Sequence, residues 1–206
     1  MSRKRLLHIA LGKREPRAWT DVFIAALREL GDLELIEQGK KLPPAELARR
    51  IRAAHVLITS WGSIGIPEEI ARDRGSLEYV CNLTGSVRPF VPLDIVEAGI
   101  PVTNWGDVIA VSVAEGAMTL LLAALKDLRH RIEHIKAGGW REDETDFGGS
   151  LEGAPVGIYG CGVIARAFIE MIRPFGPRLQ VYDPYVAELP ACLLYTSDAA
   201  DDLLCV

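Results

Sequence analysis

The chain has 206 residues, of which 49% are hydrophobic and 25% are charged, and its formal net charge is −5. This composition is typical of a soluble globular protein, and the length suffices for one large domain or two small ones. The mildly acidic balance gives no reason to expect a nucleic acid or an anionic membrane as a partner.

Targeting, cysteine and membrane signals narrow the class further. The basic start "MSRKR" is followed by an apolar run shorter than that of a signal peptide, so we expect a cytoplasmic protein. The cysteines are scattered and suggest neither a metal-binding pair nor a disulfide framework. Residues 107–128 are apolar over the length of a membrane span, but Glu115 lies in the middle, where a carboxylate is costly in lipid. We therefore expect a helix buried between domains or subunits.

The first hundred residues alternate between two hydrophobic periods. Short apolar strands are expected at residues 6–11, 33–38, 55–60, 77–83 and 100–104, and helices at residues 18–30, 43–54, 66–75 and 91–99. In the first helix one face is expected to carry Trp19, Phe23, Ala26, Leu27 and Leu30, and Gly31 ends the helix. Strands that alternate with helices predict an α/β fold with a parallel sheet covered on both faces, here a flavodoxin-like domain over residues 1–103.

A different organisation begins at residue 104. One long helix is expected from about Ala110 to Ala137, followed by Gly138 and Gly139 and a polar connector. Residues 156–159 then form an expected strand, residues 163–173 a helix, and residues 179–183 a second strand. This order predicts an incomplete Rossmann nucleotide-binding domain over residues 104–191.

The glycine turn in this second domain carries the strongest chemical signal. "GCGVIA" is Gly160-x-Gly162-x-x-Ala165, and it stands between the expected strand and helix. Gly160 permits the tight turn, and Gly162 lets the backbone approach a pyrophosphate. We expect the amides of Val163 and Ile164 to point at the phosphates from the positive end of the helix.

Asp183 lies at the tip of the next strand. It follows Gly162 by about 20 residues, the spacing expected for a carboxylate that accepts hydrogen bonds from the adenosine ribose. A carboxylate there repels a 2′-phosphate, and no Arg follows to bind one, so the cofactor is predicted to be NAD. The alternative is a plain glycine turn followed by an ordinary strand-end aspartate.

A second candidate loop follows the expected strand at residues 77–83. Thr84, Gly85, Ser86 and Val87 sit at the carboxyl end of that strand, where open α/β sheets bind ligands. Backbone amides of this loop can hold a small anion such as a substrate carboxylate, although a plain turn is the alternative. Residues 60–65, "SWGSIG", end a neighbouring strand, so two glycine-containing loops are expected to converge.

Histidines give no metal site in the sequence. His130 and His134 are four residues apart on the expected long helix, but no third ligand accompanies them.

The stretches "GIPVTNWGDVIAVSVAEGAMTLLLAALK" and "GIYGCGVIARAFIEMIRPFGPRLQVYDPY" together resemble the D-isomer-specific 2-hydroxyacid dehydrogenase family. The resemblance implies an NAD-dependent oxidoreductase that interconverts a 2-keto acid and a D-2-hydroxy acid. It implies NAD contacts by the turn and Asp183, carboxylate binding by residues 84–87, and a position near the nicotinamide for Ser112. It also implies a homodimer that packs through the helix near residues 110–137.

The chain also departs from the family pattern. The family's catalytic Arg, acid and His follow the second Rossmann strand, in stretches that do not occur here after Asp183. Hydride transfer to a 2-keto acid needs a cation at the carbonyl and a proton donor, so no catalytic residue is assigned and the chain alone is expected to be inactive.

Residues 192–206, "CLLYTSDAADDLLCV", resemble the translated read-through of a sequencing adapter and are predicted to be a non-native tail. A genuine short C-terminal extension is the alternative. For function, the alternatives are a non-catalytic NAD-binding module that serves regulation or dimerisation, and another Rossmann enzyme such as a formate or amino-acid dehydrogenase.

Overall fold

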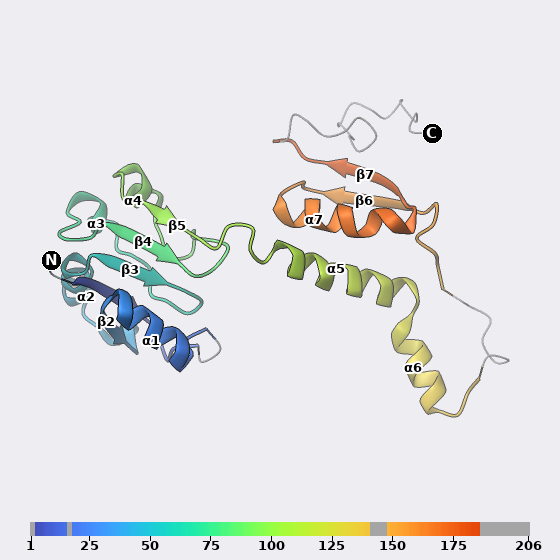
Figure 1. Cartoon of the computed structure of the whole chain (residues 1–206), viewed down its shortest axis with the longest axis horizontal. Coiled ribbons are helices and arrows are strands. Elements are labelled where there is room, and N and C mark those ends of the chain that lie inside the picture. The colour runs from blue at the N-terminus through green and yellow to red at the C-terminus, as the bar shows by residue number, and fades with distance from the viewer. Residues whose placement is uncertain (1–2, 16–17, 141–147, 186–206) are drawn as a thin grey trace. The chain divides into compact units, whose positions relative to one another are not determined.

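The computed structural model describes residues 3–15, 18–140 and 148–185. The chain divides into two compact units, Met1–Gly106 and Asp107–Val206 (Figure 1). Each unit has its own sheet.

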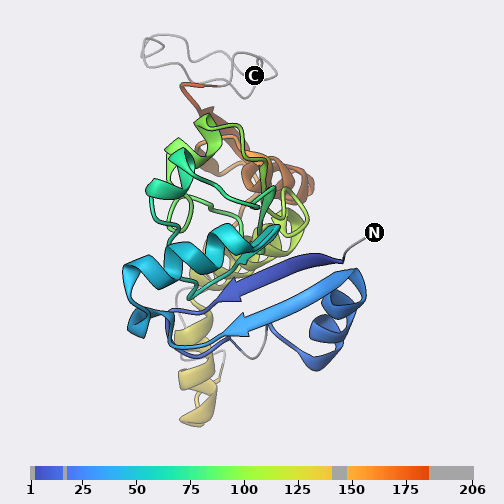
Figure 2. The same cartoon turned by 90° about the vertical axis from the view of Figure 1, so that its left-hand side faces the viewer.

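The first unit is built on a parallel sheet. In the part of the chain that the structure describes, its strands are β1 (Lys4–Ile9), β2 (Gly31–Ile36), β3 (Val56–Thr59), β4 (Tyr79–Asn82) and β5 (Val102–Thr103), in the order β2-β1-β3-β4-β5. All pairings are parallel, and Figure 2 shows β1 and β2 side by side. This is the flavodoxin-like order, so the predicted parallel α/β architecture is confirmed.

Helices cover both faces of this sheet. They are α1 (Asp21–Leu30), α2 (Pro44–Ala53), α3 (Glu69–Arg72) and α4 (Leu93–Glu97), with a short 3-10 turn η1 (Gly39–Lys41) before α2. Successive strand residues point to opposite faces, so Leu6 and Leu7 enter different cores. Leu6 packs in a cluster with Trp19 and Ile24 on the side of α1. Leu7 belongs to the larger cluster formed with α2, α3 and α4.

The buried face of α1 differs from the sequence prediction. Ile24 is buried, whereas Ala26 is exposed and Leu30 is 73% exposed. Leu30 is the last residue of the helix, and the chain turns directly into β2 at Gly31, so Leu30 lies beyond the core. A Cβ on Gly31 would stand 2.3 Å from the Lys4 carbonyl oxygen, so only glycine allows β2 to pack this closely against β1.

The second unit contains α5 (Ala110–Leu125), α6 (Leu128–Lys136), β6 (Pro155–Tyr159), α7 (Val163–Ile172), a 3-10 turn η3 (Arg173–Phe175) and β7 (Arg178–Tyr182). Strands β6 and β7 pair in parallel, and α7 connects them. Buried Met118 of α5 and Ile172 of α7 share a core with Leu151, and Val156 of β6 packs against it. The result is a β-α-β unit whose helix α7 packs against α5.

The single long helix predicted for residues 110–137 is wrong, because the chain breaks between α5 and α6. Asp127 has φ +44°, a left-handed conformation that aspartate tolerates better than most residues. Polar groups at the break find partners in the connector. Gly149 donates its backbone N–H to the Leu125 carbonyl at 2.9 Å, and Lys126 Nζ donates to the Gly149 carbonyl at 2.7 Å. The connector therefore caps the end of α5.

In the described part of the chain, every helix is too short or too polar to cross a membrane.

His8 is a titratable group inside the first unit. It is buried on β1, its Nδ1 lies 2.9 Å from the Ile58 carbonyl oxygen, and its ring lies 4.0 Å from the Trp19 ring. Burial lowers the pKa of His8 from 6.5 to about 4, because the charged imidazolium loses its hydration. His8 is therefore held neutral, with Nδ1–H donating to Ile58.

We predict that acid weakens the first unit through His8. The unfolded chain protonates His8 near pH 6.5 and the folded chain only near pH 4. The contribution of His8 to the free energy of unfolding is therefore complete above pH 6.5 and falls by about 3 kcal/mol as the pH drops through 4. His8→Asn keeps a donor for Ile58 and removes the titration, so its urea midpoint should change less over this range.

Tryptophan fluorescence is a suitable signal, because Trp19, Trp61 and Trp105 belong to the first unit. His130→Asn, at an exposed position on α6, is the control and should keep the wild-type pH dependence. An equal pH dependence in His8→Asn and wild type would contradict the assignment.

Candidate functional site

The glycine turn follows β6 directly. Gly160 has φ +91°, which only glycine adopts readily, and Gly162 is the residue before α7. A Cβ placed on Gly162 would meet no atom of the described residues within 4 Å. Among those residues the space beside Gly162 is therefore open, and none of them needs a glycine here for packing.

The structure brings Asp183 to this turn. Cys161 donates its backbone N–H to Asp183 Oδ2 at 2.6 Å, and Tyr185 donates its N–H to Oδ1 at 2.8 Å. Gly160 donates its N–H to the Tyr182 carbonyl at 2.7 Å. Two segments far apart in the sequence are thus tied together at the carboxyl ends of β6 and β7.

The amino end of α7 completes this arrangement. Within residues 3–15, 18–140 and 148–185, no side chain caps the helix at Gly162, and Val163 and Ile164 are exposed in its first turn. The first amides of a helix have no partner within the helix, and they stand at the positive end of its dipole. An open glycine, free helix amides and a carboxylate on the next strand fit the pyrophosphate and ribose of a dinucleotide.

The second candidate site lies after β4. Thr84 is buried and Ser86 is exposed. The side chain of buried Asn82 holds this loop: Nδ2 lies 2.9 Å from the Thr84 carbonyl oxygen, 2.8 Å from Thr84 Oγ1 and 3.2 Å from the Ser86 carbonyl oxygen. Asn82 Oδ1 accepts from Thr59 Oγ1 at 2.9 Å. Asn82 therefore ties the loop to both β3 and β4.

Sequence reasoning missed the role of Asn82. The available signal was an amide side chain at the end of an apolar strand, directly before a glycine-containing loop. Such a side chain, once buried, must find partners for its N–H groups and its oxygen. Loop carbonyls are the nearest acceptors.

The loop at residues 60–65 contacts the segment that follows β5, and its predicted convergence with residues 84–87 stays a prediction. Ser60 donates its N–H to Ser63 Oγ at 2.7 Å, and Trp19 Nε1 donates to Ser60 Oγ at 3.1 Å. Trp61, in the same loop, pairs with Trp105 after β5, with ring centroids 5.3 Å apart. The loops that follow β3 and β5 therefore touch at the carboxyl edge of the sheet.

Ser112 is exposed in the first turn of α5, in the second unit. Its predicted position near a nicotinamide stays a prediction, as do the ligand roles of residues 84–87. His130 and His134 stack on α6 with ring centroids 6.0 Å apart, and His134 Nε2 lies 3.2 Å from the Trp140 carbonyl oxygen.

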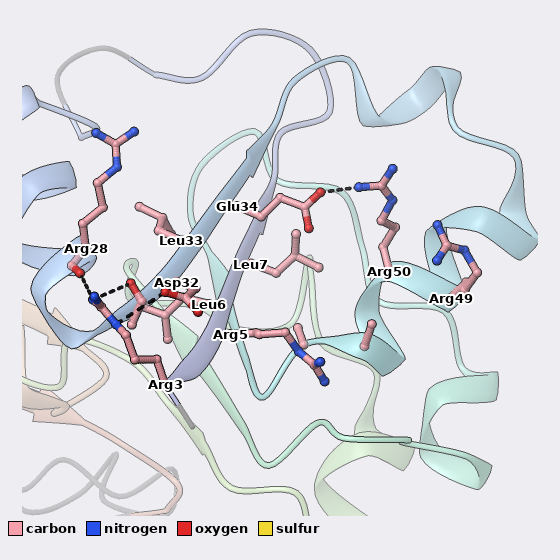
Figure 3. A pocket seen from close by; sticks show the side chains of 13 residues that line it. Arg3, Arg5, Leu6, Leu7, Arg28, Asp32, Leu33, Glu34, Arg49 and Arg50 are labelled. Atoms are coloured by element: carbon pink, nitrogen blue, oxygen red, sulfur yellow. Dashed lines mark hydrogen bonds and ion pairs between the residues drawn. The ribbon is translucent and has the colours of Figure 1, made fainter. Parts of the chain in front are cut away.

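A hollow of about 730 Å³ lies at the other end of the first sheet, where β1 and β2 begin (Figure 3). Its lining includes five arginines, Arg3, Arg5, Arg28, Arg49 and Arg50, together with Asp32 and Glu34. Figure 3 shows the ion pairs of Arg3 with Asp32 and of Arg50 with Glu34.

Hydrogen bonds from Arg49 and Arg50 lower the pKa of neighbouring Glu46 to about 2. Carboxylates thus engage three of these arginines, and the hollow is remote from the loops described above.

A parallel β-α-β unit with an open glycine turn and an acid on the second strand defines a dinucleotide-binding domain. A sequence profile described as "D-isomer specific 2-hydroxyacid dehydrogenase, NAD binding domain" matches residues 118–204. This match supports the D-isomer-specific 2-hydroxyacid dehydrogenase family, which is also the family that the sequence resembles. The matched range reaches into residues 192–206, which lie outside the described residues, so the assignment of a non-native tail stays a prediction.

Individual relatives agree with this family. The chain is 29% identical over 164 residues to D-3-phosphoglycerate dehydrogenase of Methanocaldococcus jannaschii, covering 79% of this chain and 30% of that protein. It is 29% identical over 181 residues to glyoxylate reductase/hydroxypyruvate reductase of Homo sapiens, covering 86% and 54%. The crystal structure of an NADPH-dependent glyoxylate/hydroxypyruvate reductase from Sinorhizobium meliloti matches with a TM-score of 0.72 and 25% identity, covering 95% and 58%. The chain thus spans 30% to 58% of the length of these relatives.

We predict that Gly162→Ala weakens dinucleotide binding without weakening the fold. The new methyl meets open space within the chain, and Gly162 has φ −73°, which alanine also adopts. The methyl stands where the pyrophosphate must approach, so the affinity for NADH should fall at least about tenfold, roughly 1.4 kcal/mol. Calorimetric titration measures the affinity, and thermal unfolding checks the fold.

Gly157→Ala on β6 is the matched control, because its methyl also meets nothing within 4 Å. It should bind NADH as the wild type does. Unchanged NADH affinity in Gly162→Ala would exclude the turn as the pyrophosphate site.

Proposed function

We propose that this chain is part of an NAD-dependent dehydrogenase that interconverts a 2-keto acid and a D-2-hydroxy acid. The observation that carries the proposal is the hydrogen bond from the Cys161 amide to Asp183, which joins the glycine turn to the acid of the second strand. When bound, the nicotinamide gives or takes the hydride. The residues of this chain hold the cofactor: the α7 amides take the pyrophosphate and Asp183 takes the ribose.

The substrate carboxylate is assigned to the loop at residues 84–87. Amides of Gly85 and Ser86 are proposed to bind it, and Asn82 positions them through its contacts with Thr84 and Ser86. Because Asn82 is buried and bonded on both sides, the loop is arranged before any ligand arrives, which lowers the ordering cost of binding.

Proton transfer is proposed to need groups outside this sequence. The stretches that carry the family's Arg, acid and His have no counterpart after Asp183. The 206 residues by themselves are therefore expected to bind cofactor and substrate without turning them over. The cytoplasmic location likewise stays a prediction from the sequence.

We predict a preference for NADH over NADPH that depends on Asp183. Its carboxylate accepts hydrogen bonds from the Cys161 amide of the turn and from the Tyr185 amide, so a 2′-phosphate bound there meets a fixed negative charge. NADH should bind at least about tenfold more tightly than NADPH. Asp183→Asn removes the charge and should narrow this ratio, mainly by tightening NADPH binding.

Calorimetric titration of both cofactors measures this ratio. Glu170→Gln removes an exposed carboxylate from the same unit, on α7, and should leave the ratio unchanged. A ratio near one in the wild type, or no change in Asp183→Asn, would contradict the assignment of NAD.

We further propose a homodimer that packs through α5. One face of this helix packs on α7, but Val113, Ala117, Leu120 and Ala124 are all exposed. Their spacing places them in one stripe along the helix, and Leu120 is 72% exposed. An apolar stripe on an already packed helix favours burial against a second copy of the chain.

We predict that Leu120→Glu converts a dimer into a monomer, because the carboxylate cannot be buried in an apolar interface without a partner. Sedimentation velocity gives the mass. Val22→Glu, at an exposed valine on α1, is the control and should remain dimeric. A monomeric wild type, or a dimeric Leu120→Glu, would rule out this interface.

A further inference from the structure

Two tryptophans meet at the carboxyl edge of the first sheet. The rings of Trp61 and Trp105 are 5.3 Å apart at 75°, an edge-to-face arrangement, and Trp61 is 57% exposed. Indoles are among the largest apolar groups in proteins, and exposing one to water is unfavourable. The pair therefore offers apolar surface that a ligand could cover.

Trp105 is held against the proposed carboxylate loop. A Cβ on Gly85 would stand 2.8 Å from Trp105 Nε1, so the absence of a side chain at Gly85 lets the indole approach. Asn104 fixes the neighbouring backbone: its Nδ2 donates to the Gly85 carbonyl at 2.5 Å, and its Oδ1 accepts from the Gly106 amide at 2.9 Å. The aromatic pair and the loop are thus adjacent parts of one surface.

The polar groups around Trp61 are already engaged within the chain. Ser60 Oγ accepts from Trp19 Nε1, and Ser63 Oγ accepts from the Ser60 amide. Both serines are buried, so what this loop presents to solvent beside Trp105 is chiefly the Trp61 indole. The surface beside the carboxylate loop therefore suits an apolar group better than a hydroxyl or a phosphate.

We propose that Trp61 and Trp105 form the wall that receives the substrate side chain, and that the substrate is a 2-keto or 2-hydroxy acid with a large branched or aromatic side chain. The inference rests on the proposed function, in which residues 84–87 hold the carboxylate. A carboxylate at Gly85 places the neighbouring carbon and its substituent beside Trp105. A two-carbon acid has no side chain to cover the indoles, so the wall adds nothing to its binding.

The test is a binding series on the 206-residue chain with saturating NADH. The ligands are glycolate, D-lactate, D-2-hydroxyisocaproate, D-phenyllactate and D-2-hydroxyglutarate, and calorimetric titration gives each affinity. NADH and these acids are both reduced, so no turnover interferes. Affinity should rise from glycolate to the two large apolar acids by at least about tenfold, since each buried methylene adds roughly fourfold.

Trp61→Ser should remove the rise in affinity from glycolate to the large apolar acids and leave the affinity for glycolate unchanged. Trp140→Ser, at an exposed tryptophan of the second unit, is the matched control and should keep this rise in affinity. Equal affinities across the series, or tighter binding of the large acids by Trp61→Ser, would contradict the proposal that the tryptophans receive the side chain. Either result would leave standing the proposal that residues 84–87 bind the carboxylate. Tightest binding of D-2-hydroxyglutarate would overturn the wall in favour of a charged site led by exposed Arg88. Failure of every acid, glycolate included, would overturn the carboxylate loop and the wall with it.

Discussion

The bond between the Cys161 amide and the Asp183 carboxylate is the contact on which the proposed cofactor site depends. It holds the end of β7 against the turn that follows β6, so the acid and the helix amides stand at one edge of the sheet. Gly160 provides the positive φ that the turn needs, and Gly162 leaves the space beside the turn open. The residues proposed to bind the phosphates and the residue proposed to bind the ribose are therefore parts of one hydrogen-bonded arrangement.

The first unit uses the same principle at its own carboxyl edge. Buried Asn82 bonds to Thr59 on one strand and to the loop at residues 84–87, so the sheet itself fixes the loop. Trp105 then lies against Gly85, and Trp61 packs edge-to-face with Trp105. A polar contact sets the position of the backbone, and an aromatic pair provides apolar surface beside it. Together they suit an acid with a carboxylate at one end and an apolar side chain.

Strand and helix periodicity predicted most of the fold, because burial patterns repeat along regular elements. The sequence predictions were wrong where a single residue position determines how an element ends. Leu30 has the right spacing for the α1 core, but Gly31 turns the chain into β2 before Leu30 can be covered. The helix expected over residues 110–137 breaks at Asp127, where hydrogen bonds to the connector at Gly149 replace helical ones. Neither event has a periodic signal, since each depends on a contact with another segment.

By itself the sequence determined the parallel α/β class and the G-x-G-x-x-A turn between a strand and a helix, and it indicated the family, because these depend on local spacing and residue type. Only the tertiary structure decided what those residues touch. It joined Asp183 to Cys161, made Asn82 the support of the loop after β4, and placed Trp105 over Gly85. These pairs come from segments that meet only when parallel strands align their carboxyl ends, and hydrogen bonds and packing between such segments leave no regular spacing in the sequence.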